Sequence, residues 1–249
     1  MMNNQDKIEY ITQWIIDYVG KMPRPAKSLV VGVSGGIDSA LTSTLSSLTG
    51  INTIAISMPI SKSSGALDLS KIHGKWLEEK YKNTNFLTID LTSTYKQFNS
   101  TLVHNNQLSD LGFANSKSRL RMVTLYQVAS SQEGIVVGTG NKVEDFGVGF
   151  YTKYGDGGVD ISPIADLMKS EVKNLASTLG VDQRIIDAPP TDGLWDDDRT
   201  DEAQLGLNYD ELEDAMKNES SSNKEKYLSI RNNNLHKMEP IPVCKIPDN

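Results

Sequence analysis

The chain has 249 residues, enough to bury one large core, and no linker, internal repeat or low-complexity tract divides it, which predicts a single domain over residues 1–249. Its formal net charge of −7 argues against a broad surface for nucleic acid or for an anionic membrane, so anionic ligands must be held by a few local cations and by metal. The sequence has neither the apolar core of a signal peptide nor a stretch approaching the roughly 20 apolar residues that span a bilayer, which predicts a cytoplasmic protein. The single cysteine, Cys244, lies close to the end of the chain and is interpreted as an incidental thiol rather than a nucleophile.

The first predicted element is an amphipathic helix over residues 6–20. Its apolar side chains fall at helical spacing: Ile8, Ile11, Trp14, Ile15, Tyr18 and Val19. The face formed by Ile11, Trp14, Ile15 and Tyr18 is larger than a peripheral helix needs. It predicts either packing within the molecule or a two-fold contact in a homodimer.

A glycine loop follows the first predicted strand, residues 28–33, and reads Gly32, Val33, Ser34, Gly35, Gly36, Ile37, Asp38, Ser39. Gly35 and Gly36 lack a Cβ, so the backbone N–H groups and the positive end of the next helix can approach an anion closely. No lysine follows the second glycine, which excludes the Gly-Lys-Ser/Thr loop that grips the terminal phosphates of ATP. Asp38 would repel phosphate unless a cation lay between them, so the loop implies Mg²⁺. A plain turn between strand and helix is the alternative.

The rest of the chain alternates strands with helices. Strands are predicted at residues 51–57, 85–90 and 134–138, and helices near 66–81, 92–104 and 114–132. This alternation predicts an α/β fold with a doubly wound, mostly parallel sheet flanked by helices. His73 and His104 are expected on exposed helix faces.

In such sheets ligands bind beyond the carboxyl ends of the strands, where the winding direction reverses, here between the first and fourth strands. The glycine loop should therefore meet the segment from Thr139 to Glu144. Glu144 offers a second oxygen ligand that, with Asp38 and substrate phosphates, suits octahedral Mg²⁺. The alternative for Glu144 is a solvated loop carboxylate.

The glycine loop resembles that of the ATP pyrophosphatases, and further tracts narrow the resemblance to the ammonia-dependent NAD synthetases over about residues 8–240. These tracts are Lys117–Met122, Gly138–Lys142, Phe150–Asp160, Ser162–Lys169 and Ala188–Trp195. The Lys-Tyr-Gly-Asp-Gly-Gly run is the discriminating one, because a generic ATP site has no need of it. The resemblance implies an adenine nucleotide alpha hydrolase-like fold.

The resemblance also implies site residues. The ATP contacts would be Gly32, Val33, Ser34, Gly35, Gly36, Ile37, Asp38, Ser39, Thr139, Lys169 and Thr191. The dinucleotide contacts would be Arg119, Lys153, Asp160, His236 and Lys237, with Mg²⁺ on Asp38 and Glu144 and catalytic roles for Asp160 and Lys169.

Residue chemistry agrees with these roles but does not require them. Lys169 suits the charge that builds on departing pyrophosphate, and Thr191 sits on a loop stiffened by prolines. A solvated Lys169, a plain loop at Thr191 and a solvated tail at His236 and Lys237 are the alternatives. Arg119 and Arg121 point about 200° apart on a helix, so at most one should face the site, and Arg119 is the prediction.

The implied reaction joins ammonia to nicotinic acid adenine dinucleotide (deamido-NAD) at the expense of ATP, through an acyl adenylate, giving NAD, AMP and pyrophosphate. Asp160 is the candidate acceptor of the proton that ammonium loses. Two other functions remain open. An RNA-thiolating enzyme would share the glycine loop but is expected to carry basic stripes or paired cysteines, and a regulatory nucleotide-binding module would not need residues 153–160.

The position of the second metal ligand is ambiguous. In the family pattern eight positions separate the metal glutamate from the lysine of Lys-Tyr-Gly-Asp, whereas Glu144 and Lys153 are nine apart. Counting back from Lys153 selects Asp145, and counting forward from Thr139 selects Glu144. The forward count is preferred because a strand end fixes Thr139, while Gly147 and Gly149 can absorb an extra residue.

Overall fold

A parallel sheet forms the centre of the computed structural model, which describes residues 2–60, 68–195, 197 and 199–246. Within these residues the sheet has four strands in the order β3-β2-β1-β4: β1 Ser28–Gly32, β2 Asn52–Ser57, β3 Thr84–Thr88 and β4 Gly134–Val136. Ser28 lies opposite Asn52 of β2 and opposite Gly134 of β4, so the carboxyl ends of the three strands share one edge. The predicted doubly wound parallel fold is confirmed, and the winding direction reverses between β1 and β4.

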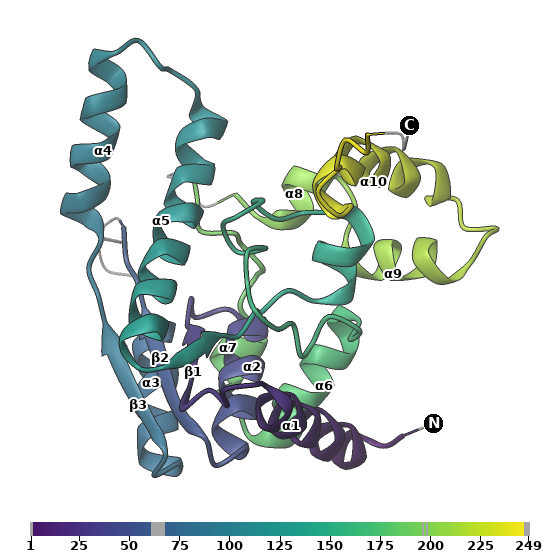
Figure 1. Ribbon diagram of the computed structural model, residues 1–249. Coiled ribbons are helices and arrows are strands. Elements are labelled where there is room, and N and C mark those ends of the chain that lie inside the picture. Colours follow the sequence, from purple (N-terminus) through teal and green to yellow (C-terminus); the bar gives the residue numbers. More distant parts are fainter. Residues whose placement is uncertain (1, 61–67, 196, 198, 247–249) are drawn as a thin grey trace.

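Helices cover both faces of this sheet (Figure 1). They are α1 Asn4–Lys21, α2 Ile37–Leu48, α3 Leu69–Lys80, α4 Thr92–His104, α5 Asp110–Ser131, α6 Lys169–Leu179, α7 Gln183–Ile186, α8 Asp201–Leu205, α9 Tyr209–Lys217 and α10 Lys224–Met238. A π-helix, η1 Lys142–Val148, follows β4. The predicted helices 6–20, 92–104 and 114–132 correspond to α1, α4 and α5, and the first two residues predicted for α3 lie outside the described residues.

Side chains of β1 divide the core between the two faces. Leu29 and Val31 pack with α1, α2 and α6, whereas Val30 packs with α4 and α5. A strand buried on both faces reads as a continuous apolar run, which is how Leu29-Val30-Val31 could be recognised in the sequence.

The predicted apolar face of α1 is divided between the interior and the surface. Ile11 and Ile15 are buried against α2 and α6, whereas Trp14 and Tyr18 remain 39% and 41% exposed and stack on each other with ring centroids 5.8 Å apart. Packing within the molecule therefore accounts for the isoleucines and leaves the two aromatic side chains on the surface.

The prediction of an exposed His73 is wrong. His73 is buried, and its Nε2 lies 3.0 Å from the Ser43 hydroxyl of α2. Burial lowers the pKa of His73 to about 4, so the ring is neutral at physiological pH. His104 is exposed, as predicted.

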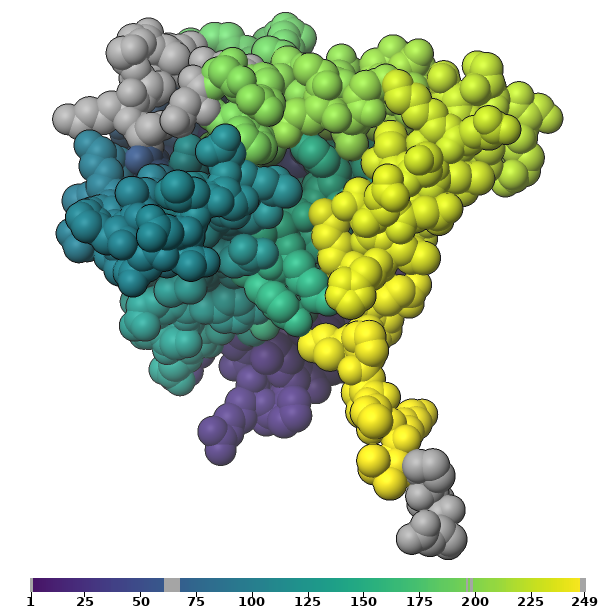
Figure 2. Space-filling view, turned by 90° about the horizontal axis from the view of Figure 1, so that it is seen from above, coloured from purple at the N-terminus to yellow at the C-terminus, as the bar shows by residue number. Residues whose placement is uncertain are grey.

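The helices α8, α9 and α10 lie together at one side of the molecule, where α9 and α10 pack on η1 (Figure 1). Their shared apolar core joins Val143 and Val148 of η1 to Leu205, Leu212 and Tyr227. Beyond α10 the chain leaves the body as an extended tail that carries the exposed Cys244 (Figure 2). No helix of the described residues is long and apolar enough to cross a membrane.

Candidate active site

The glycine loop leaves β1 and turns directly into α2. Gly35 has a φ of +94°, and a Cβ there would lie 3.0 Å from the backbone nitrogen of Ser70, so both the conformation and the contact with α3 favour glycine. The Ser34 and Ser39 hydroxyls lie 3.1 Å apart and form a hydrogen bond across the loop. No side-chain hydrogen bond caps the first turn of α2, so the backbone N–H groups of this turn are available to bind an anion.

Three charged side chains from distant segments meet beside this loop. Lys169, at the first position of α6 and only 4% exposed, donates to Asp38 Oδ2 over 2.6 Å and to Glu144 Oε1 over 2.7 Å. Asn141 donates to the other oxygen of Asp38 over 3.1 Å while its own oxygen accepts from the backbone N–H of Glu144. The predicted meeting of the glycine loop with the segment after β4 is therefore found, and Lys169 joins the two.

The charges of this cluster depend on one another. Burial would lower the pKa of Lys169, but the charges of Asp38 and Glu144 outweigh it and raise that pKa, so the ammonium keeps its proton. Burial likewise acts to raise the pKa of Glu144, but Lys169 and the Tyr209 hydroxyl hold it below its usual range. For Asp38, burial dominates and raises the pKa.

These two carboxylates fit a magnesium ion. Both face one shared cation, the Lys169 ammonium, and both supply hard oxygen donors. Across the described residues no group of three or more histidine, cysteine, aspartate or glutamate side chains is arranged to hold a metal by itself. Mg²⁺ commonly takes one or two protein carboxylates and completes its shell with substrate phosphates and water, which suits this pair.

The π-helix η1 accommodates the extra residue between Glu144 and Lys153. Its wider turns take up more residues than α-helical ones, and it ends at Gly149, whose φ is +69°. Within η1, Glu144 points to Lys169, whereas the Asp145 carboxyl lies against the backbone of Gly140, where a Cβ would come within 1.9 Å of Oδ2. Burial and the nearby Asp156 raise the pKa of Asp145 well above its usual range.

The Lys-Tyr-Gly-Asp-Gly-Gly run forms a tight turn fixed to α5. Asp156 accepts from the Ser118 hydroxyl over 2.6 Å and from the backbone N–H of Thr152 over 3.0 Å. Tyr154 takes a left-handed φ of +65°, which is uncommon for a bulky residue, and its ring is exposed. The Asp156 residue itself is exposed to solvent.

Lys237 of α10 also reaches this region. Its ammonium donates to the carbonyl of Tyr151 over 2.7 Å. Burial lowers its pKa, while the charges of Asp156 and Asp145 act to raise it. His236 is exposed on the same helix. The pair therefore belongs to a helix rather than to a tail, and Lys237 lies toward the acidic side chains.

The two arginines of α5 point in different directions, as predicted. Arg119 is exposed and donates to the carbonyl of Lys153 over 3.2 Å, beside the tight turn. Arg121 donates to the carbonyl of Met58, beyond the carboxyl end of β2, over 3.2 Å. Burial lowers the pKa of Arg121, against the charges of Asp156 and Asp192. Arg121 is therefore a second cation at the same edge of the sheet, which the choice of Arg119 alone missed.

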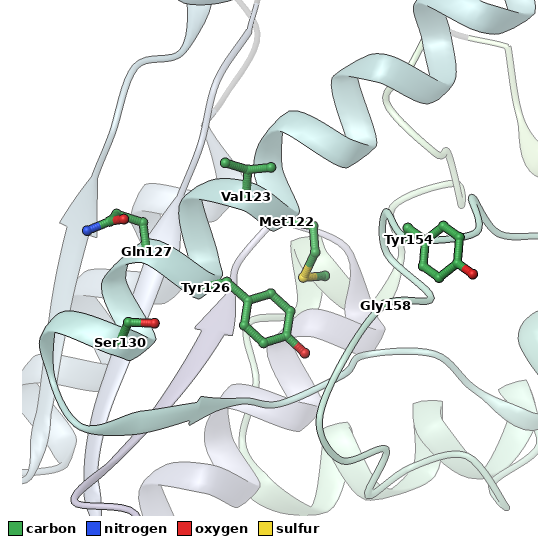
Figure 3. Close-up of a pocket in the computed structure, with 7 residues that line it drawn as sticks. All are labelled: Met122, Val123, Tyr126, Gln127, Ser130, Tyr154 and Gly158. Atoms are coloured by element: carbon green, nitrogen blue, oxygen red, sulfur yellow. The ribbon is translucent and has the colours of Figure 1, made fainter.

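Asp160 lies at the edge of β4, beside a pocket of about 600 Å³. Its carboxylate accepts from the backbone N–H of Val136 over 2.7 Å and from the Tyr126 hydroxyl over 3.0 Å. Figure 3 shows Tyr126 and Met122 of α5 facing the loop that carries Tyr154 and Gly158. No hydrogen bond or ion pair within the described residues joins Asp160 to the Lys169 cluster, so the two predicted catalytic residues occupy different parts of the site.

Two further predicted ATP contacts are Thr139 and Thr191. Thr139 is half-buried just beyond β4, and Thr191 is exposed on the segment before α8. Two residues near Glu144 were not predicted at all. Tyr209 donates its hydroxyl to Glu144 Oε1 over 2.6 Å, and Asp201 lies 3.3 Å from the same hydroxyl. No local motif marks either residue, and the contact between Tyr209 and Glu144 joins positions 65 apart in the sequence.

The comparisons with known proteins agree with this geometry. A family model described as NAD synthase matches residues 7–243, which include every residue of the site. The chain belongs to the NAD synthase family. An NH(3)-dependent NAD(+) synthetase from Methanosarcina acetivorans is 40% identical over 204 residues, which cover 80% of this chain and 77% of that protein.

Solved structures of related proteins share the fold over nearly the whole chain. An NMN synthetase from Francisella tularensis is 29% identical, with a TM-score of 0.88 over 99% of this chain and 100% of that one. An NAD+ synthetase from Burkholderia pseudomallei is 25% identical, with a TM-score of 0.76 over 95% of this chain and 90% of that one. Membership of the NAD synthase family makes the chain a ligase and disfavours the RNA-thiolating and regulatory alternatives.

Substitution of the two adjacent acidic residues separates their roles. We expect Glu144→Gln to lower kcat by at least about 100-fold, the loss typical of a group that stabilises charge in the transition state, and to raise the Mg²⁺ requirement. Asp145→Asn should be mild, because that carboxyl faces Gly140 and not Lys169. Steady-state kinetics over a range of Mg²⁺ concentrations measures both effects, and the reverse ranking would assign the metal to Asp145.

Proposed function

We propose that this protein amidates deamido-NAD with ammonia, using ATP and releasing NAD, AMP and pyrophosphate. The observation that carries the proposal is the convergence of Asp38, Glu144 and Lys169 beside the glycine loop, in a chain of the NAD synthase family. The helix that follows this loop, α2, has no side-chain cap on its first turn. Phosphate donors, a metal-binding carboxylate pair and a fixed cation thus lie at one edge of the sheet.

The chemistry begins with activation of a poor electrophile. The nicotinate carboxylate attacks the α-phosphorus of ATP, the bond to the β-phosphate oxygen breaks, and pyrophosphate leaves. Ammonia then attacks the acyl carbon of the resulting adenylate and displaces AMP. No protein nucleophile is required, so positioning and neutralisation of charge supply most of the rate.

Each charged residue of the cluster has a proposed role in this sequence. The N–H groups at the start of α2 receive phosphate oxygens, and the Lys169 ammonium neutralises charge on the departing pyrophosphate. Mg²⁺, held by Asp38 and Glu144, would neutralise phosphate charge when bound. Thr139 and Thr191 are proposed as further ATP contacts.

We propose that the dinucleotide lies along α5 and the tight turn, in contact with Arg119, Lys153, Asp160, His236 and Lys237. The pocket between Tyr126 and Tyr154 has aromatic and apolar walls that suit a flat ring. Asp160 is exposed and accepts from the hydroxyl of Tyr126, which lines this pocket, and this supports its proposed role as acceptor of the proton that ammonium loses.

The nitrogen source provides a direct test of this function. Incubation with ATP, deamido-NAD, Mg²⁺ and ammonium should yield NAD together with AMP and pyrophosphate, whereas glutamine free of ammonia should not. Cys244→Ala should leave the activity intact, since Cys244 is an exposed free cysteine beyond α10. Absence of NAD, or equal turnover with glutamine, would contradict the proposal.

A second candidate acceptor is the mononucleotide, nicotinic acid mononucleotide, which lacks the adenylate half. The likeness to the NMN synthetase from Francisella tularensis favours it, because its TM-score of 0.88 exceeds the 0.76 found with the Burkholderia NAD+ synthetase. We expect kcat/KM to be higher for deamido-NAD, as the names of the sequence relatives suggest. Competition between the two acceptors, with both amides quantified by chromatography, decides, and a preference for the mononucleotide would reverse our assignment.

We also propose that the protein acts as a homodimer in the cytoplasm. Trp14 and Tyr18 of α1 are exposed hydrophobic side chains, and so is Val123, which lines the pocket. A second copy of the chain would cover such side chains. Light scattering at micromolar protein should give twice the chain mass of 27.4 kDa. A monomer mass under these conditions would contradict the homodimer.

A further inference from the structure

Tyr209 touches both charged residues at the proposed metal position. Its hydroxyl donates to Glu144 Oε1 over 2.6 Å, and its ring centroid lies 4.8 Å from the Lys169 ammonium. The side chain is only 8% exposed, so water has little access to compete for the hydroxyl. A phenol has one proton to donate, and the shorter of its two contacts assigns that proton to Glu144.

The surrounding structure gives the Tyr209 hydroxyl little freedom. Tyr209 is the first residue of α9, whose start is fixed by a capping box between Asn208 and Glu211. Its ring packs in the apolar core that α8, α9 and α10 share with η1, together with Val143 and Leu212. A side chain held at both backbone and ring can orient its hydrogen-bond partner.

Asp201 lies behind the same hydroxyl. It is 5% exposed, its Oδ2 is 3.3 Å from the Tyr209 oxygen, and its Oδ1 has no hydrogen-bond partner in the part of the chain that the structure describes. The backbone N–H of Asp201 donates to the carbonyl of Pro190 over 3.1 Å, which joins the two ends of the segment that carries Thr191. Asp201 therefore lies between that segment and Tyr209, as a second and weaker acceptor beside the Tyr209 hydroxyl.

We propose that Tyr209 is a positioning residue for the metal carboxylate: its hydroxyl holds Glu144 in the orientation in which Glu144 and Asp38 face one cation. This inference rests on the proposed role of Glu144 as a magnesium ligand. It assigns to Tyr209, at the start of α9, a part in metal binding that reaches the ion only through Glu144.

Tyr209→Phe tests the inference, because it removes one oxygen and keeps the ring against Lys169. Mn²⁺ binding in the presence of ATP, followed by electron paramagnetic resonance, should weaken by about 10- to 100-fold, the usual cost of losing a partner that orients a metal ligand. ATP binding without metal should stay unchanged, and the Mg²⁺ concentration for half-maximal activity should rise in parallel. Asp201→Asn removes the competing acceptor for the same proton, so its Mn²⁺ binding should not weaken.

Tyr227→Phe is the matched control. Tyr227 is also buried in the core shared by η1 and α10, but its hydroxyl faces the carbonyl of Gly147, at 3.4 Å, and not Glu144. Its Mn²⁺ affinity should stay unchanged. An equal shift in Tyr227→Phe would overturn the inference, because it would trace the effect to packing of the helices.

Glu144→Gln in the same binding assay separates the inference from the function on which it rests. Weaker Mn²⁺ binding in Glu144→Gln with unchanged binding in Tyr209→Phe overturns only the positioning role. Unchanged binding in both overturns the metal role of Glu144 itself. If thermal denaturation shows that Tyr209→Phe does not fold, Asp201→Asn carries the test: it removes the competing acceptor, so Mn²⁺ binding that weakens there overturns the inference.

Discussion

A single buried ammonium holds the site together. Lys169 is only 4% exposed and has two carboxylates as its counter-charges, and each carboxylate comes from a segment other than α6. A buried charge without a partner is costly, so the first turns of α2, η1 and α6 must approach one another for any of the three charges to be tolerated. A buried ion-pair cluster of this kind contributes little net stability to the fold, and its effect is to fix the arrangement of these three segments.

The arrangement of the strands explains why these segments meet. Parallel strands in register bring the ends of β1 and β4 to the same edge, so the residues that follow them face one space. The α6 helix begins at that edge with Lys169, and the Glu171 carboxylate accepts from the backbone N–H of Met168 over 2.9 Å at this helix start. Glu171 in turn is paired with Lys7 of α1, which connects the amino-terminal helix to the same helix start.

The sequence alone could predict the sheet, the glycine loop and the meeting of Asp38 with Glu144, because each follows from local pattern together with one topological rule. It could not predict Tyr209, which reaches Glu144 across 65 positions of sequence with no motif at either end. It also misplaced His73, since a lone histidine on a helix gives no sign of the Ser43 hydroxyl that receives it. On α1 the helical spacing identified the apolar side chains, but it did not distinguish Ile15, which is buried in the core, from Trp14, which is exposed at the surface.

The apolar contact between η1 and the last three helices makes those helices part of the catalytic unit. Val143 and Val148 lie on either side of Glu144 in the sequence, and both are buried by residues that come after position 200. A fragment that stopped after α6 would keep the recognisable motifs from the glycine loop to Lys169, yet it would expose the inner face of the π-helix to water. The smallest piece of this chain able to hold its own metal carboxylate in place therefore extends to α10, well beyond the last motif that identifies the family.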